Sequence, residues 1–290
     1  MIEMAFSQKR ISVEFELANG QFEGGGNTAE VFGLRVACNI VNAGQGSGQA
    51  EISIWGLPLA LMNQLSTVGS QYLQMYKNGI SLLAGDDETG QNVVWTGTIV
   101  YAYVDAQAMP DVCFRISSLP GVFHAAKPIP PLSIKGSGDA SQMMKSLAGQ
   151  MGLAFEDAGV KVKFANPYYP GTAWTQMLAI ARDGGFDVGV DRGTMVITPP
   201  GKARNSDTVL ISAETGMVGY PFFQQAFVLV RALYNPAVKY QGKVQIQSDL
   251  TPANGTWKVN RLEYQLEAMM PHGKWFMLLE CIAVDASAPA

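Results

Sequence analysis

Two groups of adjacent acidic residues are the side chains in this sequence best suited to acid–base chemistry. They are Asp86-Asp87-Glu88 and Glu156-Asp157. Paired carboxyl groups can hydrolyse a glycosidic bond when one is protonated and the other is ionised. Adjacent acids in a turn more often mark a solvated surface, and neither group comes with the aromatic platform of a sugar site. The first group also lacks the alternating ligands of a calcium-binding loop.

The two histidines and three cysteines could bind a metal or supply a nucleophile. His124 lies in a proline-flanked linker and His272 in a Met-Pro turn, and neither has a second His or Cys at ligand spacing. Cys38, Cys113 and Cys281 are odd in number, widely spaced and set in apolar, strand-like contexts. This pattern predicts buried free thiols in a reducing compartment, and no metal site.

Glycine-flanked residues do not complete a nucleophile or phosphate motif. Ser47 stands between glycines, but no helix follows it directly, as a nucleophile elbow would require. The Gly44-x-Gly46 pair fails the dinucleotide fingerprint, because Gln49 replaces the third glycine and a strand follows. Neither Lys77 nor Lys202 follows the glycine spacing of a phosphate loop. The sequence therefore predicts no catalytic, cofactor-binding or metal-binding residue.

Composition points to a globular protein whose surface is covered by partners. The chain has 290 residues, of which 48% are hydrophobic and 15% charged, with a net charge of -4. So little charge is unusual for an isolated soluble domain. Scattered basic residues in an acidic chain argue against specific nucleic-acid binding. No apolar run is long enough for a membrane span, and the start lacks an export signal, so we expect synthesis in a cytoplasm.

Two stretches of the chain repeat the same order of features. In each, an alternating strand follows a glycine, a second strand follows a Gly-Thr pair, and a Met-Pro turn leads to a third strand. The markers are Gly79, Gly97-Thr98 and Met109-Pro110 in the first stretch, and Gly242, Gly255-Thr256 and Met270-Pro271 in the second. A repeated strand module is typical of a protein that builds a ring or barrel.

Further strands and one short helix complete the first part of the chain. Alternation predicts strands at residues 11–17, 31–41, 50–55, 72–76, 79–84, 93–104 and 112–118. Pro58 precedes a predicted helix at residues 59–65, which we expect to close near Gly69.

The character of the chain changes at Leu119, where prolines crowd a short span. Asp139 can cap a helix at residues 140–151, with Gln142 in the capping-box position. Thr172 can cap a second helix at residues 173–182, with Trp174, Met177, Leu178 and Ala181 on its inner face. A strand pair at 153–155 and 161–164 and a hairpin at 186–198 make this segment an α+β insert, which ends at Pro199-Pro200-Gly201.

Strands then return at residues 208–212, 226–233, 243–247, 256–267 and 275–284. We therefore predict a first β domain at 1–118, the insert at 119–201, a second β domain at 202–285 and a tail at 286–290. The five tryptophans read as core, and the methionines as core or partner-facing residues.

Several runs together resemble the baseplate hub proteins of contractile, Mu-like phages. In the second β domain they are residues 233–238, 242–246, 254–259, 262–266 and 273–276; in the insert, 147–156, 174–179 and 184–186; and near the start, 33–35, 54–57 and 62–67. The resemblance covers nearly the whole chain, and the order of the runs carries it.

The resemblance implies a mainly β protein with an α+β insert and two tube-like β-barrel domains per chain. Three chains would form a pseudo-sixfold ring that joins the hexameric tail tube to the trimeric spike. Tape measure and wedge proteins are further implied partners, and the genome would pass through the channel. The family supplies no catalytic residues or cofactor, and its place is the virion tail, assembled in the host cytoplasm. The alternatives are a spike-hub component of a contractile secretion system, and a cell-wall hydrolase using the acidic turns.

Overall fold

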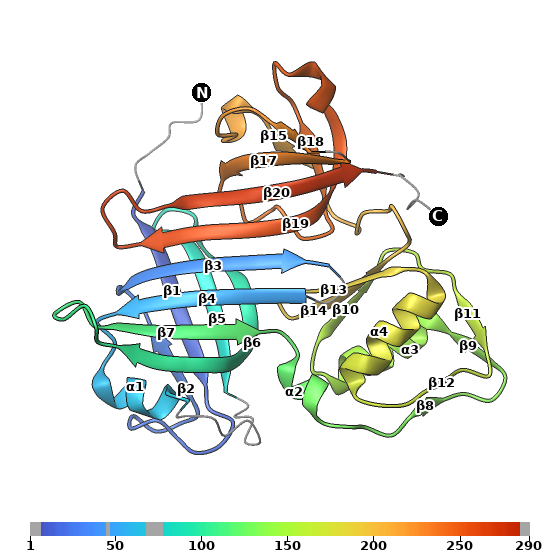
Figure 1. The fold of residues 1–290 in the computed structure, drawn as a ribbon, viewed down its shortest axis with the longest axis horizontal. Helices are drawn as coiled ribbons and strands as arrows, with labels where there is room; N and C mark the ends of the chain where they lie inside the picture. The colour runs from blue at the N-terminus through green and yellow to red at the C-terminus, as the bar shows by residue number, and fades with distance from the viewer. Residues whose placement is uncertain (1–6, 45–46, 68–77, 225, 285–290) are drawn as a thin grey trace. The chain divides into compact units, whose positions relative to one another are not determined.

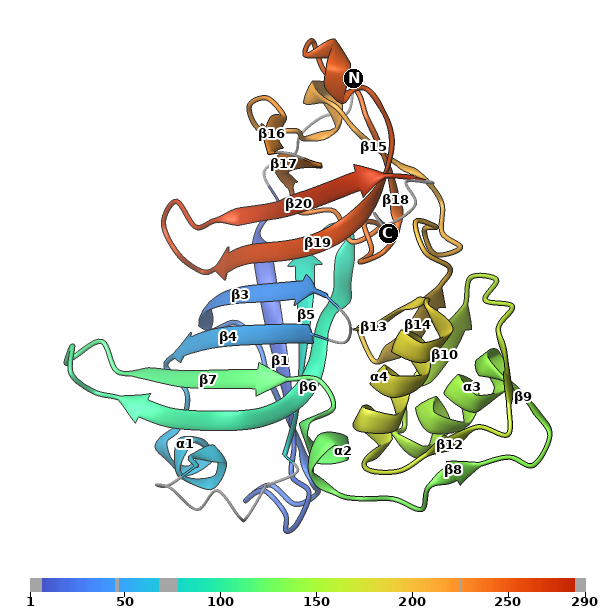
Figure 2. The same ribbon diagram turned by 45° about the vertical axis from the view of Figure 1, so that its right-hand side comes forward.

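The computed structural model describes residues 7–44, 47–67, 78–224 and 226–284 (Figures 1 and 2). The chain folds into two compact units. The first comprises Met1–Ile40, Gln49–Leu119 and Tyr264–Trp275, and the second comprises Val41–Gly48, Pro120–Glu263 and Phe276–Ala290. The predicted strand at 72–76, the helix stop at Gly69 and the tail at 286–290 lie outside the described residues.

The first unit is built on antiparallel strands. They are β1 (Lys9–Glu16), β2 (Thr28–Val31), β3 (Arg35–Ala43), β4 (Ser47–Trp55), β5 (Gly79–Asp86), β6 (Gly90–Asp105) and β7 (Cys113–Leu119). Their order in the sheet is β3-β4-β7-β6-β5-β1-β2 (Figure 1). Alternation decides which face is buried: Val13 and Phe15 of β1 point into the core, whereas Glu14 and Glu16 are exposed. The predicted helix is present as α1 (Leu59–Leu65), with Pro58 at its N-cap.

The long Pro120–Glu263 segment of the second unit starts with the region predicted to be an α+β insert. Its elements are α2 (Val122–Ala126), β8 (Leu132–Ser133), β9 (Ser137–Asp139), α3 (Ala140–Gln150), β10 (Ala154–Asp157), β11 (Lys163–Ala165), β12 (Tyr168–Tyr169), α4 (Ala173–Gly184), β13 (Asp187–Asp191) and β14 (Thr194–Thr198). Helix α3 packs against α4 and β10, and α4 contacts β13, so both helices lie on the sheet β10-β14-β13 (Figure 2). Both predicted caps form, because Asp139 accepts from the N–H of Gln142 and Thr172 accepts from the N–H of Thr175, each at 3.1 Å. Among the described residues, no helix has the length and apolar character of a membrane span.

Two expectations for the insert are wrong. The strand near residue 154 does not pair with the strand near 163: β10 runs parallel to β14, and β11 pairs with β9. His124 lies in α2 instead of a linker, since no proline interrupts the residues from Gly121 to Lys127. The predicted inner face of α4 is confirmed, because Met177 and Ala181 lie in the core and Trp174 and Leu178 pack against it. Gln176, which the prediction did not include, is also fully buried on this helix. The Gln176 Nε2 group donates there to the carbonyls of Pro130 and Gly171, at 3.2 and 3.1 Å.

The rest of the second unit returns to strands. They are β15 (Val209–Ile211), β16 (Phe222–Gln224), β17 (Phe227–Leu233), β18 (Lys243–Ile246), β19 (Gly255–Ala268) and β20 (Trp275–Ala283), with 3₁₀ turns η1 (Ala213–Thr215) and η2 (Thr251–Ala253). The sheet order is β16-β17-β20-β19, with β18 beside β19 and β15 beside β18 (Figure 1).

The strand order repeats between the two parts of the chain. The earlier part contains five strands that lie side by side in the order β3-β4-β7-β6-β5. The later part contains five strands in the order β16-β17-β20-β19-β18, so in both sets the neighbours are the first, second, fifth, fourth and third strand along the chain. The repeat is therefore larger than the three strands visible in the sequence. One detail differs from the prediction, because Gly97-Thr98 lies inside β6, which already begins after the turn at Asp86–Gly90.

A buried ionic network fixes the insert to the strands that follow it. The Arg204 side chain, 5% exposed, donates to Asp191 at 2.8 Å and also pairs with Glu156. Lys258 of β19, 2% exposed, donates to Asp187 of β13 at 2.8 Å. These contacts connect β10 and β13 with later parts of the same unit, so breaking one leaves a charge buried without its partner.

We predict that Arg204→Met lowers the free energy of unfolding by about 3–5 kcal/mol, because Asp191 then loses its cation at 2.8 Å and keeps only Arg192, at 3.8 Å. Urea unfolding followed by circular dichroism measures this change. The matched control is Lys145→Met on the exposed face of α3, for which a change below about 0.5 kcal/mol is expected. Equal losses in the two variants would contradict a stabilising role for the network.

Candidate assembly surfaces

The first acidic group holds a turn together. Asp86 Oδ1 accepts from the N–H of Glu88 at 3.1 Å and from the N–H and hydroxyl of Thr89 at 2.7 and 2.8 Å. Its other oxygen pairs with Lys9 Nζ at 3.2 Å. Asp87 accepts from the N–H of Gln8 at 2.9 Å. These carboxylates close the β5–β6 turn and fix the start of β1 beside it.

The second acidic group is also engaged in structural contacts. Glu156 pairs with Arg204, and Asp157 accepts from the N–H groups of Gly159 and Val160 at 2.8 Å each. The two acidic groups belong to different units, and each group makes its hydrogen bonds and ion pairs within its own unit.

The predicted histidines and thiols are separate from one another. His124 lies in α2 and His272 in the β19–β20 turn, at a positive φ of 55°. In the described part of the chain, no three His, Cys, Asp or Glu side chains gather as metal ligands would. The three cysteines are free and buried. Burial raises the pKa of the Cys38 and Cys281 thiols to about 12, which keeps them protonated at neutral pH.

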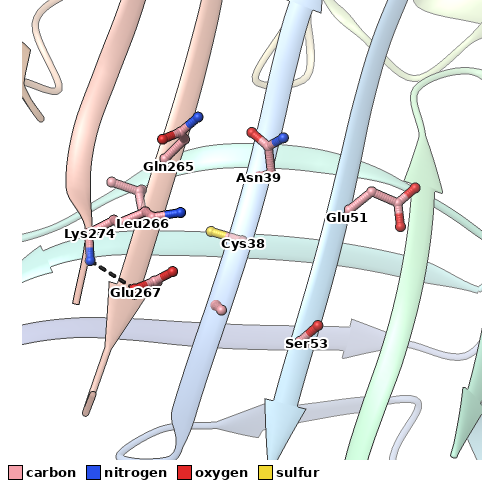
Figure 3. Close-up of a pocket in the computed structure, with 9 residues that line it drawn as sticks. Cys38, Asn39, Glu51, Ser53, Gln265, Leu266, Glu267 and Lys274 are labelled. Carbon is pink, nitrogen blue, oxygen red and sulfur yellow. Dashed lines mark hydrogen bonds between the residues drawn. The ribbon is translucent and has the colours of Figure 1, made fainter. Parts of the chain in front are cut away.

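A polar hollow lies over the first unit's sheet. Figure 3 shows Gln265 and Glu267 of β19, Asn39 of β3, and Glu51 and Ser53 of β4 around it. The Lys274 N–H donates to Glu267 at 2.9 Å, and Ser117 of β7 donates to Glu51 at 2.8 Å. The open hollow encloses about 250 Å³, which is small for a ligand pocket. Both carboxylates of its lining, Glu51 and Glu267, are already hydrogen-bonded.

One exposed apolar cluster lies on β6 of the first unit. Val100, Tyr101 and Tyr103 are 42%, 52% and 38% exposed, and the two tyrosine rings are 5.1 Å apart. A bulge between Ile99 and Tyr101 turns Val100 outward. Among the described strands, residues 99–105 have β7 on one side and none on the other. We call residues 99–105 the tyrosine edge.

A second cluster lies along the outermost segment of the second unit. Its exposed members are Val218, Tyr220, Phe222, Phe223 and Leu233, of which Tyr220 and Phe222 are 67% and 64% exposed. Residues 216–224, which end in β16, run along β17 and are the last described segment on this side of the sheet. We call residues 216–224 the aromatic edge.

These two edges are the surfaces best suited to bind another protein. Exposed aromatic side chains are enriched at protein interfaces. The aromatic edge is also the end of its described sheet, and such strand edges are templates for association. The sequence analysis missed both edges, because an aromatic residue in a strand reads the same whether it packs within a chain or between chains. A usable signal was present in residues 220–223, where aromatic residues cluster without strand alternation.

Comparison with known proteins agrees with a surface built for assembly. The family model described as "Baseplate hub gp41" matches residues 10–279. No curated protein matches in sequence. A tail protein from Neisseria meningitidis has a similar fold, with a TM-score of 0.62 at 11% identity over 95% of this chain and 96% of that one.

Two further solved structures share the fold. The 43 kDa tail protein of prophage MuSo2 from Shewanella oneidensis has a TM-score of 0.62 at 9% identity, covering 97% of this chain and 100% of that one. An E. coli component of the type VI secretion system has a TM-score of 0.59 at 9% identity, covering 95% and 79%. The E. coli protein is described as similar to the T4 tail proteins gp27 and gp5.

The Asp86 turn predicts a specific pH dependence of stability. The pKa of Asp86 is held well below its usual value, and the largest cause is the hydrogen bond that its carboxylate accepts from the N–H of Thr89. A lowered folded-state pKa stabilises the fold above the unfolded pKa of about 3.9, and this contribution is lost as the pH falls below it. The stability difference between the native protein and Asp86→Asn should therefore shrink as the pH is lowered from 6 to 2.

Urea unfolding at a series of pH values measures this difference. Glu88→Gln is the matched control, because Glu88 enters the turn through its backbone N–H, which the substitution keeps. A pH-independent gap between the native protein and Asp86→Asn would contradict the assigned role.

Proposed function

Since the chain belongs to the baseplate hub gp41 family and is a structural component of a phage tail baseplate, we propose that it acts as a homotrimer joining the tail tube to the spike. The hub would carry the tube protein on one face and the spike protein on the other. Tape measure and wedge proteins are its further proposed neighbours, and assembly would take place in the host cytoplasm.

The observation that carries this proposal is the repeated strand order. Each chain contains two five-strand modules of the same order, β3-β4-β7-β6-β5 and β16-β17-β20-β19-β18. Three such chains supply six similar modules. A closed ring of that kind would present near-sixfold symmetry to a hexameric tube and threefold symmetry to a trimeric spike. In the ring each module would close into a tube-like β-barrel domain.

The polar chemistry of the chain supports a structural role. The acidic groups that could have formed a hydrolase site are committed to the Asp86 turn and to the Arg204 network. The similar E. coli secretion component supports the shared hub architecture. The phage baseplate family favours the tail over a secretion system.

We expect the purified protein at micromolar concentration to have three times the 31.2 kDa mass of one chain. The physical reason is that both exposed apolar edges gain burial when copies associate. Light scattering coupled to size exclusion measures the mass, and negative-stain images should show a ring with a central channel. A mass of one chain at every concentration up to 100 µM, roughly the range where weak complexes form, would contradict the trimer.

A further inference from the structure

We propose that the aromatic edge of one copy, residues 216–224, packs against the tyrosine edge, residues 99–105, of the next copy and so closes the ring. This inference rests on the proposed trimer and adds the location of its contact. The occupant of each edge is therefore a second copy of this chain.

The chain contains its own example of such a junction. Strand β3 is not the end of its sheet, because β19 lies beyond it. The residues Tyr264–Ala268 of β19 belong to the first unit together with β3, and Cys38 of β3 interacts with the backbone of Leu266. The first strand of one module thus pairs with the later half of the fourth strand of the other module.

The repeated order indicates which strands would form the equivalent junction. Strand β16 occupies the place of β3, and β6 occupies the place of β19. The equivalent of the β3–β19 junction is therefore a β16–β6 junction, made by the start of the second module and the later half of β6. Within the described residues of one chain, these two segments do not pair.

The side chains on both segments fit this role. The two edges carry seven of the large hydrophobic side chains that are exposed in the described residues. An eighth, Leu233, lies beside the aromatic edge. The contact would be heterologous, so each copy uses both edges and a closed ring leaves neither of them exposed.

The backbone of both edges indicates that side chains would supply most of the contact. In the aromatic edge, Gly219 has a φ of +74° and Pro221 has no N–H, which interrupts a regular strand. In the tyrosine edge, the N–H of Ala102 already donates to the Thr67 hydroxyl at 2.8 Å, and its carbonyl accepts from the Thr67 N–H at 2.9 Å. Aromatic packing around these points matches the exposed residues better than a continuous ladder would.

Photo-crosslinking tests the location directly. Phe222, which is 64% exposed, is replaced by p-benzoylphenylalanine in the full chain, and equal amounts of ¹⁴N- and ¹⁵N-labelled protein are mixed before assembly. After irradiation, mass spectrometry should find residue 222 joined to a peptide containing residues 99–105, with half of the joined pairs isotopically mixed. The matched control carries the same probe at Tyr168, which is 62% exposed on the insert, and should not label that peptide.

The outcomes separate this inference from the proposed function. A trimeric mass with crosslinks from residue 222 to another segment, or with no mixed pairs, would overturn the β16–β6 contact and leave the trimer intact. A monomeric mass would overturn both.

Charge substitution gives an independent test. Phe222→Asp and Tyr101→Asp each place an unpaired carboxylate in the proposed contact, and either one should abolish the trimer peak in size exclusion. Both side chains are more than half exposed in the single chain, so the circular dichroism spectrum should be unchanged. Tyr168→Asp is the control and should keep the trimer. Persistence of the trimer in both test variants would contradict the proposed junction.

Discussion

Every strand in a sheet must have its backbone groups hydrogen-bonded on both sides or exposed to water, and this constraint organises the whole protein. Within each module, the inner strands form backbone hydrogen bonds with a neighbouring strand on each side, and the alternation of side chains directs one face of the sheet into the core. The outer strand of each module then needs either a further strand or water as the hydrogen-bonding partner of its free side. The chain meets this requirement once internally, where β19 lies beside β3. The proposed contact between copies would meet it at the equivalent position.

A second layer of organisation comes from charges buried inside the second unit. Arg204 and Lys258 hold β10 and β13 against the strands that follow the insert. A buried ion pair adds little net stability over a well-packed apolar group, but a wrong arrangement would leave charges unpaired. The network is therefore best understood as fixing one arrangement of the insert.

Local patterns in the sequence predicted most elements of the fold. Alternation located the longer strands, Asp139 and Thr172 marked the starts of α3 and α4, and the Met-Pro turns marked the two long hairpins. The short strands β2, β8, β9, β12 and β16 were not predicted. The limits of local patterns show in the insert, where β10 pairs with β14 across a long separation in sequence instead of with the nearer β11.

The sequence by itself determined the secondary structure, the repeated module and the family resemblance, because these depend on residue type and short spacing. Only the tertiary structure decided which strands are neighbours, which charges are buried and which aromatic residues remain exposed. Tyr101 lies in a strand whose sequence resembles that of core strands, and only the structure shows that its side chain and that of Phe222 are exposed. Strand pairing joins residues far apart in the chain, so the surfaces that serve assembly appear only when the fold is complete.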